Sequence, residues 1–288
     1  MRVGVFGNRA GRPGWRYDGR VALVTGASSG IGEQFARELA SRGMALVLSA
    51  LPVDEERLRA IAAELGSLHG ARVEVVPIDL AEQGAAKLLQ ERADALGMEP
   101  DLLVNNAGMG MLGAVAQLPI DRQLTMLRLN VEGVAALTGL YLPRMTARRD
   151  GAIINVASTA AFDPLPYMAG YAASKAFVLR FSEALWAEGS RSGVRVVAVC
   201  PGPVADTHFG AENPVVSEGT QRFQPSIPRV EVVNGALDAL DRNRPVSVHR
   251  ARGFRIVYPV TRFLGAVVPR HWHLKVAERL VRWHFRLG

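Results

Sequence analysis

A doubly wound α/β fold with a parallel sheet is predicted by the order of the apolar segments and by one glycine-rich turn. Short, β-branched apolar runs alternate with longer segments of helical periodicity over residues 20–202. The first apolar run ends in a glycine-rich turn that leads directly into a helix. No repeat, linker or low-complexity block interrupts the alternation. We therefore expect a single domain over residues 20–241, with an N-terminal extension at 1–19 and a C-terminal one at 242–288.

The predicted strands are nearly continuous apolar runs, which is typical of strands that are buried on both faces. We expect them at residues 20–26, 44–51, 71–80, 101–108, 151–158 and 194–202. Helices are expected after the first five of these strands, at residues 27–43, 53–66, 81–96, 122–145 and 171–189. In the second helix, Asp54 is a candidate N-cap and Gly66 a candidate stop.

The distribution of charge along the chain argues against a nucleic-acid-binding protein. The 288 residues carry a formal net charge of +7, but the positive charge lies mainly at the two ends. Residues 242–288 contain eleven basic side chains and a single acid, Glu278, whereas residues 21–241 carry a net negative charge. We expect no nucleic-acid partner, because the central domain has no recognised nucleic-acid motif.

The single cysteine, Cys200, excludes an intrachain disulfide and agrees with a reducing compartment. The N-terminal residues contain no apolar run of the length of a signal peptide, and no uninterrupted apolar stretch of about 18 residues predicts a membrane span. We therefore expect a cytoplasmic protein. No group of His, Cys and carboxylate residues has the spacing of metal ligands, so no metal site is predicted.

The segment TGASSGIG joins the first strand to the first helix. Its glycines allow a tight turn, the close approach of a pyrophosphate and close packing of the helix on the strand. The N–H groups at the start of the helix are then free to bind phosphate. We expect a dinucleotide to bind here, at Gly26, Ser28, Ser29, Gly30, Ile31 and Gly32.

The end of the second strand, LSALPV, is where an acid or an arginine distinguishes NAD from NADP. Neither type of residue occurs at Ala50 or Leu51, and Asp54 is better explained as the helix cap. The missing acid favours NADP(H) slightly over NAD(H).

The segment YMAGYAASK contains two tyrosines, of which one is a candidate acid/base. Tyr171 and Lys175 are four residues apart in a predicted helix and so share one face. A nearby ammonium group lowers the pKa of a phenol, which is ordinarily about 10. Tyr167 has no cationic side chain four residues on and lies in a loop, so we expect it only to line the pocket. Ser158 is a candidate to bind the substrate oxygen, and Asn130 a candidate to hold a water in a proton relay.

Together these motifs resemble the short-chain dehydrogenase/reductase family over most of the chain. TGASSGIG is similar to the family's cofactor loop, and NNAG at 105–108 to its fourth-strand motif. PGPVADT at 201–207 is similar to the motif that contacts the nicotinamide half, and Asp79 falls where the family has an acid beside the adenine. The resemblance implies further cofactor contacts at Leu80, Asn106, Ala107, Gly108, Tyr171, Lys175, Pro201, Gly202, Val204 and Thr207.

The resemblance also implies a Rossmann-type sheet of about seven strands and hydride transfer between a nicotinamide and a ketone or secondary alcohol. Asn130, Ser158, Tyr171 and Lys175 match the family's catalytic tetrad in order and spacing. Tyr171 would be the proton donor in reduction, and Ser158 would orient the oxygen. Lys175 would bind the nicotinamide ribose and lower the pKa of Tyr171, and Asn130 would keep the relay to water.

Residues 270–288 predict a basic amphipathic helix. An apolar stripe is formed by Trp272, Val276, Leu280, Trp283 and Leu287, beside a basic stripe of Lys275, Arg279, Arg282 and Arg286. Such a helix suits an anionic membrane surface, and packing on its own domain or on a second subunit explains it as well. We expect a homo-oligomer, dimer or tetramer, as is common in the family, and peripheral membrane contact through residues 270–288 stays open.

The segments expected around the site favour a hydrophobic substrate. Residues 109–114 and 159–168 are rich in Met, Leu, Phe and Pro, and residues 203–228 form a long loop of the kind that often covers a site. Two other functions stay open beside the oxidoreductase. One is a catalytically silent, dinucleotide-binding regulator, and the other is a membrane-peripheral reductase of lipid-like ketones.

Overall fold

The computed structural model describes residues 14–205, 226–250 and 270–285. In these residues seven strands form one parallel sheet in the order β3-β2-β1-β4-β5-β6-β7. The strands are β1 (Val21–Thr25), β2 (Ala45–Ser49), β3 (Val73–Val75), β4 (Leu102–Asn105), β5 (Gly151–Val156), β6 (Val194–Pro201) and β7 (Val246–His249). This confirms the predicted Rossmann-type sheet. The strand order reverses between β1 and β4, and such sheets bind ligands at this point, beyond the carboxyl ends of the strands.

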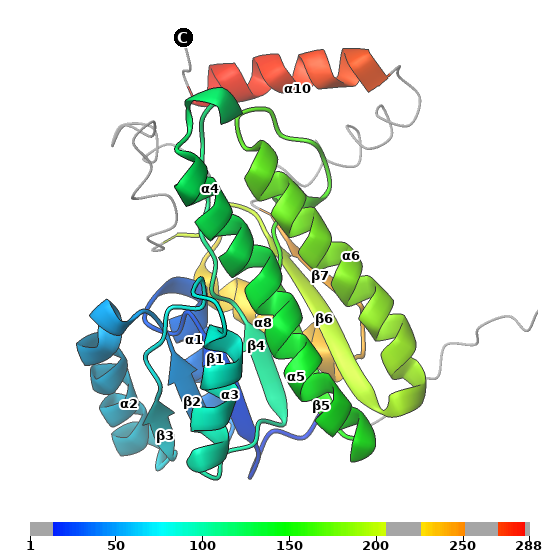
Figure 1. Cartoon of the computed structure of the whole chain (residues 1–288). Helices are drawn as coiled ribbons and strands as arrows, with labels where there is room; N and C mark the ends of the chain where they lie inside the picture. The colour runs from blue at the N-terminus through cyan, green and yellow to red at the C-terminus, as the bar shows by residue number, and fades with distance from the viewer. Residues whose placement is uncertain (1–13, 206–225, 251–269, 286–288) are drawn as a thin grey trace, which may run out of the picture.

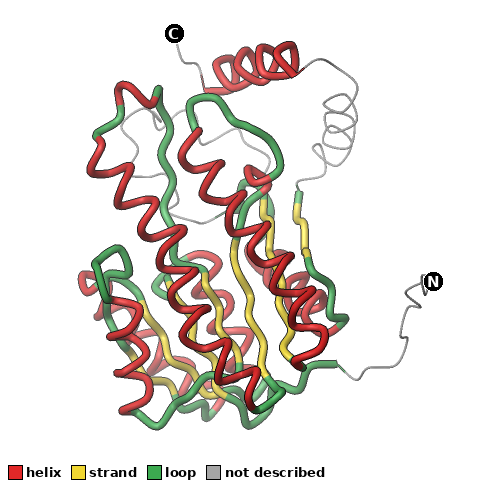
Figure 2. The backbone as a smooth tube through the Cα atoms, turned by 45° about the vertical axis from the view of Figure 1, so that its right-hand side comes forward, coloured by secondary structure: helices red, strands yellow, loops and turns green. Residues whose placement is uncertain are grey.

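Helices cover both faces of the sheet (Figures 1 and 2). The main helices are α1 (Gly30–Ser41), α2 (Glu55–His69), α3 (Ala85–Ala95), α4 (Ile120–Leu127), α5 (Val134–Ala147), α6 (Ala169–Ser192), α8 (Arg229–Asp241) and α10 (Arg270–Phe285). Short helical turns are η1 (Pro52–Asp54), η2 (Val115–Gln117), η3 (Arg128–Gly133) and η4 (Thr159–Ala161). No helix among the described residues is both long and apolar enough to cross a membrane.

The core is divided into two layers by the sheet. Because successive strand side chains point to opposite faces, the neighbours Leu23 and Val24 belong to different clusters. Val24 packs in a cluster with residues of α1, α2 and α8, and Leu23 in one with residues of α3, α5 and α6. Strands β1, β2, β4, β5 and β6 are buried on both faces, which is why they could be recognised as apolar runs.

Several predicted boundaries differ from the observed ones. The helix expected at 122–145 is interrupted by the π-helical turn η3, and the strand expected at 71–80 is ordered as a strand only at Val73–Val75. Gly66 does not end α2, which runs on to His69 and ends at Gly70 in the left-handed region with φ of 65°. Asp54 precedes α2 but makes no capping hydrogen bond with its side chain.

The sheet also extends beyond the predicted domain limits. β7 comes from the segment that we assigned to the C-terminal extension, and it pairs with β6 so that Ala198 lies opposite Val246. At the other end, Trp15 is buried, and the Tyr17 hydroxyl donates to Asp241 Oδ1 at 2.9 Å. The Trp15 backbone N–H donates to the same oxygen at 3.2 Å. Residues that we placed in both extensions are therefore part of the domain.

We predict that Asp241→Ala lowers the free energy of unfolding by about 1–3 kcal/mol, because it leaves two partly buried donors without their acceptor. Urea unfolding followed by circular dichroism measures the change. The matched control is Asp238→Ala on the same helix, since Asp238 makes only an exposed i,i+4 ion pair with Arg242 at 2.8 Å. Its effect should stay within about 0.5 kcal/mol. Equal effects of the two substitutions would show that the N-terminal contact does not stabilise the domain.

Candidate active site

The glycine-rich turn after β1 has the geometry that a phosphate-binding loop requires. Gly26 and Gly30 have φ of 63° and 57°, in the left-handed region that favours glycine. A Cβ atom on Gly32 would lie 2.1 Å from the carbonyl oxygen of Gly26 and 2.5 Å from Asn106 Nδ2. No side chain fits at position 32, so the close packing predicted for the third glycine is present.

The first turn of α1 is open for an anion. Ser29 is the N-cap residue in an extended conformation, and its side chain makes no capping hydrogen bond. The backbone N–H groups at this terminus are therefore left for a ligand, and the helix dipole favours a negative charge there. Ser28 is buried, and its hydroxyl donates to Asp54 Oδ2 at 2.9 Å. Asp54 thus binds the phosphate loop instead of capping α2.

The motif after β4 is fixed against this loop by Thr25, the first residue of TGASSGIG, which is not among the cofactor contacts that we expect. The Thr25 hydroxyl accepts from the N–H groups of Asn106 and Ala107, both at 3.0 Å. Asn106 Nδ2 in turn donates to the carbonyl oxygens of Thr25 and Gly26 at 2.9 and 3.1 Å. The two predicted cofactor segments are therefore one hydrogen-bonded unit at the switch point. The signal for Thr25 in the sequence is its position, since it is the last residue before the first glycine of the loop.

The candidate catalytic side chains meet at the carboxyl end of β5. Tyr171 and Lys175 lie one turn apart on α6, and both are buried. Ser158 follows β5 and is hydrogen-bonded with the Tyr171 hydroxyl. Lys175 Nζ donates to the carbonyl oxygen of Val156 at 2.8 Å and lies 6.0 Å from the centre of the Tyr171 ring. Ser158, Tyr171 and Lys175 are therefore brought together.

Burial dominates the electrostatics of this pair. It raises the pKa of Tyr171 to about 12, although the hydrogen bond with Ser158 acts in the opposite direction. It lowers the pKa of Lys175 to about 8, because the charged form loses its hydration. The pKa of Tyr171 is thus raised and not lowered as we expected, because desolvation of the phenol outweighs the opposing effect of the hydrogen bond.

Asn130 lies close to Lys175 and is held by the loop after β4 and by α6. It is fully buried in η3, and its Nδ2 donates to the Met109 carbonyl at 2.9 Å and to Ser174 Oγ at 3.1 Å. Its Oδ1 accepts from the Met109 N–H at 3.0 Å. A Cβ on Gly108 would lie 3.1 Å from this oxygen and 3.3 Å from Lys175 Nζ. The Asn130 side chain therefore fixes the loop after β4 beside Lys175. The role in a proton relay that we expect of Asn130 stays a prediction.

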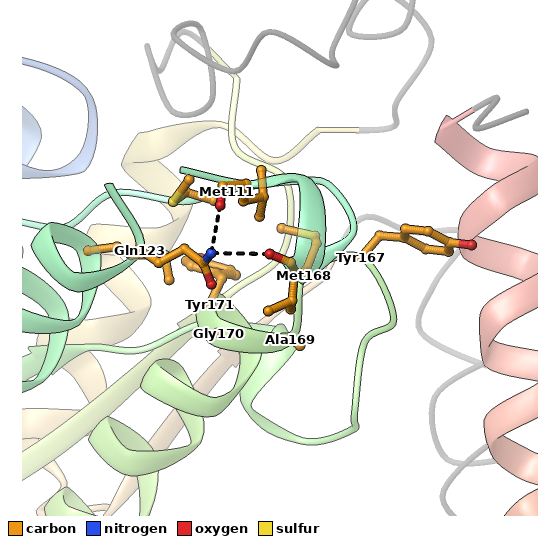
Figure 3. Close-up of a pocket in the computed structure, with 10 residues that line it drawn as sticks. Met111, Gln123, Tyr167, Met168, Ala169, Gly170 and Tyr171 are labelled. Carbon is orange, nitrogen blue, oxygen red and sulfur yellow. Dashed lines mark hydrogen bonds between the residues drawn. The ribbon is translucent and has the colours of Figure 1, made fainter. Parts of the chain in front are cut away.

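A small pocket opens beside Tyr171. Its apolar lining includes Met111, Leu118, Met126 and Met168. Figure 3 shows Gln123 closing one side, where its Nε2 donates to the carbonyl oxygens of Val115 and Leu118 at 3.3 and 3.0 Å. Tyr167 also lines the pocket, but its ring points away from Tyr171 (Figure 3).

The remaining predicted cofactor residues surround the same edge of the sheet. Asp79 Oδ1 accepts from the Ala81 N–H at 2.9 Å, and Leu80 packs in the core beside it. Pro201 ends β6, the Gly202 N–H donates to the His249 carbonyl at 2.8 Å, and Val204 pairs with Ile227. Thr207 and most of the expected lid, residues 206–225, lie outside the described residues. Within the described chain, no group of three His, Cys, Asp or Glu residues is arranged to hold a metal ion.

Comparison with known proteins agrees with this arrangement. The model of the short chain dehydrogenase family matches residues 20–214. Human "Dehydrogenase/reductase SDR family member 7" is 35% identical over 212 residues, which cover 73% of this chain and 62% of the relative. The match thus spans less than two thirds of that relative's length.

Two solved structures are similar in both sequence and fold. A short-chain dehydrogenase from Sphingobium yanoikuyae in complex with NADPH is 31% identical, with a TM-score of 0.73 over 87% of this chain and 96% of that one. The bulky-bulky ketone specific alcohol dehydrogenase from Comamonas testosteroni is 28% identical, with a TM-score of 0.69 over 87% and 95% of the two chains.

The glycine loop, the NNAG segment fixed to it and the Tyr171–Lys175 pair occupy the matched region, which covers well over half of the chain. This chain belongs to the short-chain dehydrogenase family.

Proposed function

We propose that the protein is an NAD(P)(H)-dependent oxidoreductase that interconverts a ketone and a secondary alcohol. The observation that carries this proposal is the Tyr171 hydroxyl, which is hydrogen-bonded with Ser158 at the wall of an apolar pocket while an ammonium group lies one turn away. A phenol in this setting is an acid held where a carbonyl oxygen can approach.

Each side chain has a defined task in the proposed reduction. Tyr171 donates its proton to the substrate oxygen, and Ser158 donates a hydrogen bond that orients this oxygen. Lys175, whose pKa of about 8 leaves most of it charged at neutral pH, stabilises the tyrosinate that forms. Asn130 holds the loop after β4 next to α6, because its side chain bonds both Met109 in that loop and Ser174, the residue before Lys175. It is thus a positioning residue.

The described residues fit a dinucleotide. The open N-terminus of α1 and the side-chain-free position at Gly32 form a cradle for a pyrophosphate, and Lys175 is the candidate for the nicotinamide ribose. The bound nicotinamide supplies the hydride. The protein supplies binding, orientation, the exclusion of water and the proton.

NADP(H) is the cofactor that we propose. Asp54, the nearest acid after β2, already accepts from Ser28, and Ala50 and Leu51 offer no carboxylate to a ribose hydroxyl. Arg57, in the first turn of α2, is 49% exposed and contacts Glu33 Oε2 in the first turn of α1 at 3.4 Å. An arginine near this position can accept a 2′-phosphate. The similar Sphingobium dehydrogenase was solved with NADPH.

The pocket supports a hydrophobic substrate. Met111, Leu118, Met126 and Met168 line it, and flexible thioether side chains adapt to ligands of different shape. The similar Comamonas enzyme is specific for bulky ketones. A ketone with two bulky apolar substituents is therefore the first class to test, in a panel of carbonyl compounds and alcohols.

Tyr171→Phe should lower turnover by about 10²–10⁴-fold, because it removes the proton donor and keeps the ring. Steady-state ketone reduction with NADPH measures the loss, and cofactor titration checks that the variant still binds. Tyr167→Phe is the matched control, with the same atom removed four residues away, and should stay within about threefold of the wild type. Full turnover by Tyr171→Phe would exclude the proposed mechanism. Cofactor binding by the wild type without turnover of any compound in the panel would instead indicate a silent regulator.

Arg57→Ala should weaken NADPH binding by about ten- to hundredfold and leave NADH binding nearly unchanged, because a charge-assisted hydrogen bond to the 2′-phosphate is lost. Fluorescence titration of both cofactors measures the ratio. Arg59→Ala serves as the control, because Arg59 is exposed on the same helix and pairs with Glu55. Tighter binding of NADH than of NADPH by the wild type would contradict the NADP(H) assignment.

The rate of ketone reduction should fall as the pH rises through about 8. Above this value Lys175 loses its proton and its charge, whereas Tyr171, with a pKa of about 12, keeps the proton that it must donate. The measurement is kcat between neutral and alkaline pH at saturating cofactor. The falling limb should be absent from the residual activity of Lys175→Met. The same limb in that variant would assign the pH dependence to another group.

A further inference from the structure

The C-terminal helix α10 leaves large apolar side chains in solvent. It lies above the carboxyl end of the sheet, beyond the ends of α4 and α6, and stands apart from the two-layered core (Figures 1 and 2). Trp272 is 61% exposed and Val276 51% exposed. These two residues are four positions apart, so they form one continuous apolar face over the first half of the helix.

The rotation of α10 is fixed by its contact with the domain. The Tyr167 hydroxyl donates to Glu278 Oε1 at 3.2 Å, and Figure 3 shows the Tyr167 ring pointing to this helix. At about 100° per residue, Trp272 and Val276 lie about 120° and 160° around the helix from Glu278. The side of α10 that faces the domain is therefore nearly opposite the apolar face, which is turned outward.

The exposed face of α10 is bordered by positive charge. Lys275 and Arg279 are both exposed on the helix, between the apolar face and Glu278. Glu278 is the only acid in residues 242–288, which contain eleven basic residues, and its carboxylate is turned to Tyr167. The outward side of α10 thus combines tryptophan, an aliphatic side chain and cations, with no carboxylate among its described side chains.

A helix of 16 residues is only marginally stable in water without tertiary packing. Exposed apolar side chains that are rimmed by polar residues mark contact surfaces, and the charge of the rim distinguishes the possible partners. A second copy of this chain would bring the same cations against Lys275 and Arg279. An anionic lipid surface attracts these cations and accepts tryptophan at the level of the headgroups.

We propose that the outward face of α10, formed by Trp272, Val276, Lys275 and Arg279, docks the protein on an anionic membrane surface. This inference goes beyond the proposed oxidoreductase activity and does not depend on it. Its consequence for the enzyme follows from the Tyr167 contact. Tyr167 precedes Met168 and Tyr171, which line the substrate pocket, so a docked α10 would hold the pocket entrance close to the lipid, where hydrophobic ketones concentrate.

Flotation of the full chain with vesicles tests the docking, without substrate. The protein should bind vesicles that contain phosphatidylcholine and phosphatidylglycerol, bind phosphatidylcholine vesicles weakly, and lose binding as the salt concentration rises. The double variants Lys275→Glu/Arg279→Glu and Trp272→Ser/Val276→Ser should each weaken the binding by at least about tenfold. Reduction of a water-soluble ketone should be unchanged in both, since neither pair touches the catalytic residues.

The matched control is Val53→Ser/Arg59→Glu, which removes an exposed apolar side chain (85% exposed) and reverses one exposed charge near the start of α2. It should bind vesicles like the wild type. Absence of wild-type binding to the anionic vesicles, or equal binding by all the variants, would overturn the proposal. Light scattering without vesicles measures whether the protein is a dimer. A dimer that both α10 variants convert to a monomer without vesicles would show that a second copy covers this face.

Discussion

The active site depends on one hydrogen bond, from Lys175 Nζ to the carbonyl oxygen of Val156 at 2.8 Å. This bond joins α6 to the end of β5, and it gives the buried ammonium an acceptor. Because Tyr171 lies one turn earlier on the same helix, the bond also sets the distance between the phenol and Ser158, which follows β5. Burial of Lys175 is costly in isolation. Lys175 Nζ lies 6.0 Å from the centre of the Tyr171 ring, and the catalytic role that we propose for Lys175 is a reason for this cost.

Much of this arrangement follows from local sequence rules. Strands β1, β2, β4, β5 and β6 are apolar runs because both of their faces are covered. The turn after β1 needs glycine at Gly26, Gly30 and Gly32 for steric reasons. The i,i+4 spacing of Tyr171 and Lys175 is enough to predict that they share one helix face. Interactions that depend on spacing along one element, or on the absence of a side chain, can be predicted from sequence.

The features that the sequence did not predict depend on contacts between distant segments. Asp54 has the position of a helix cap, but its carboxylate binds Ser28, 26 positions away in the chain. Asn130 is in the predicted place, but the π-helical turn that contains it and its bonds to Met109 and Ser174 were not predicted. Tyr17 and β7 were assigned to extensions, because their partners Asp241 and β6 are remote in sequence or lie across a loop.

Lys175 is thus the centre of the proposed chemistry. It is a buried ammonium whose pKa is lowered to about 8 by desolvation. The chain contains three lysines, Lys87, Lys175 and Lys275, so the titration of each can be followed by NMR after labelling of the lysine ε-carbon. We expect one signal to titrate at about pH 8, the pKa of Lys175, and to be missing from Lys175→Met. The role of Lys175 would be contradicted if the signal lost in Lys175→Met titrated near 10.5, the ordinary pKa of lysine.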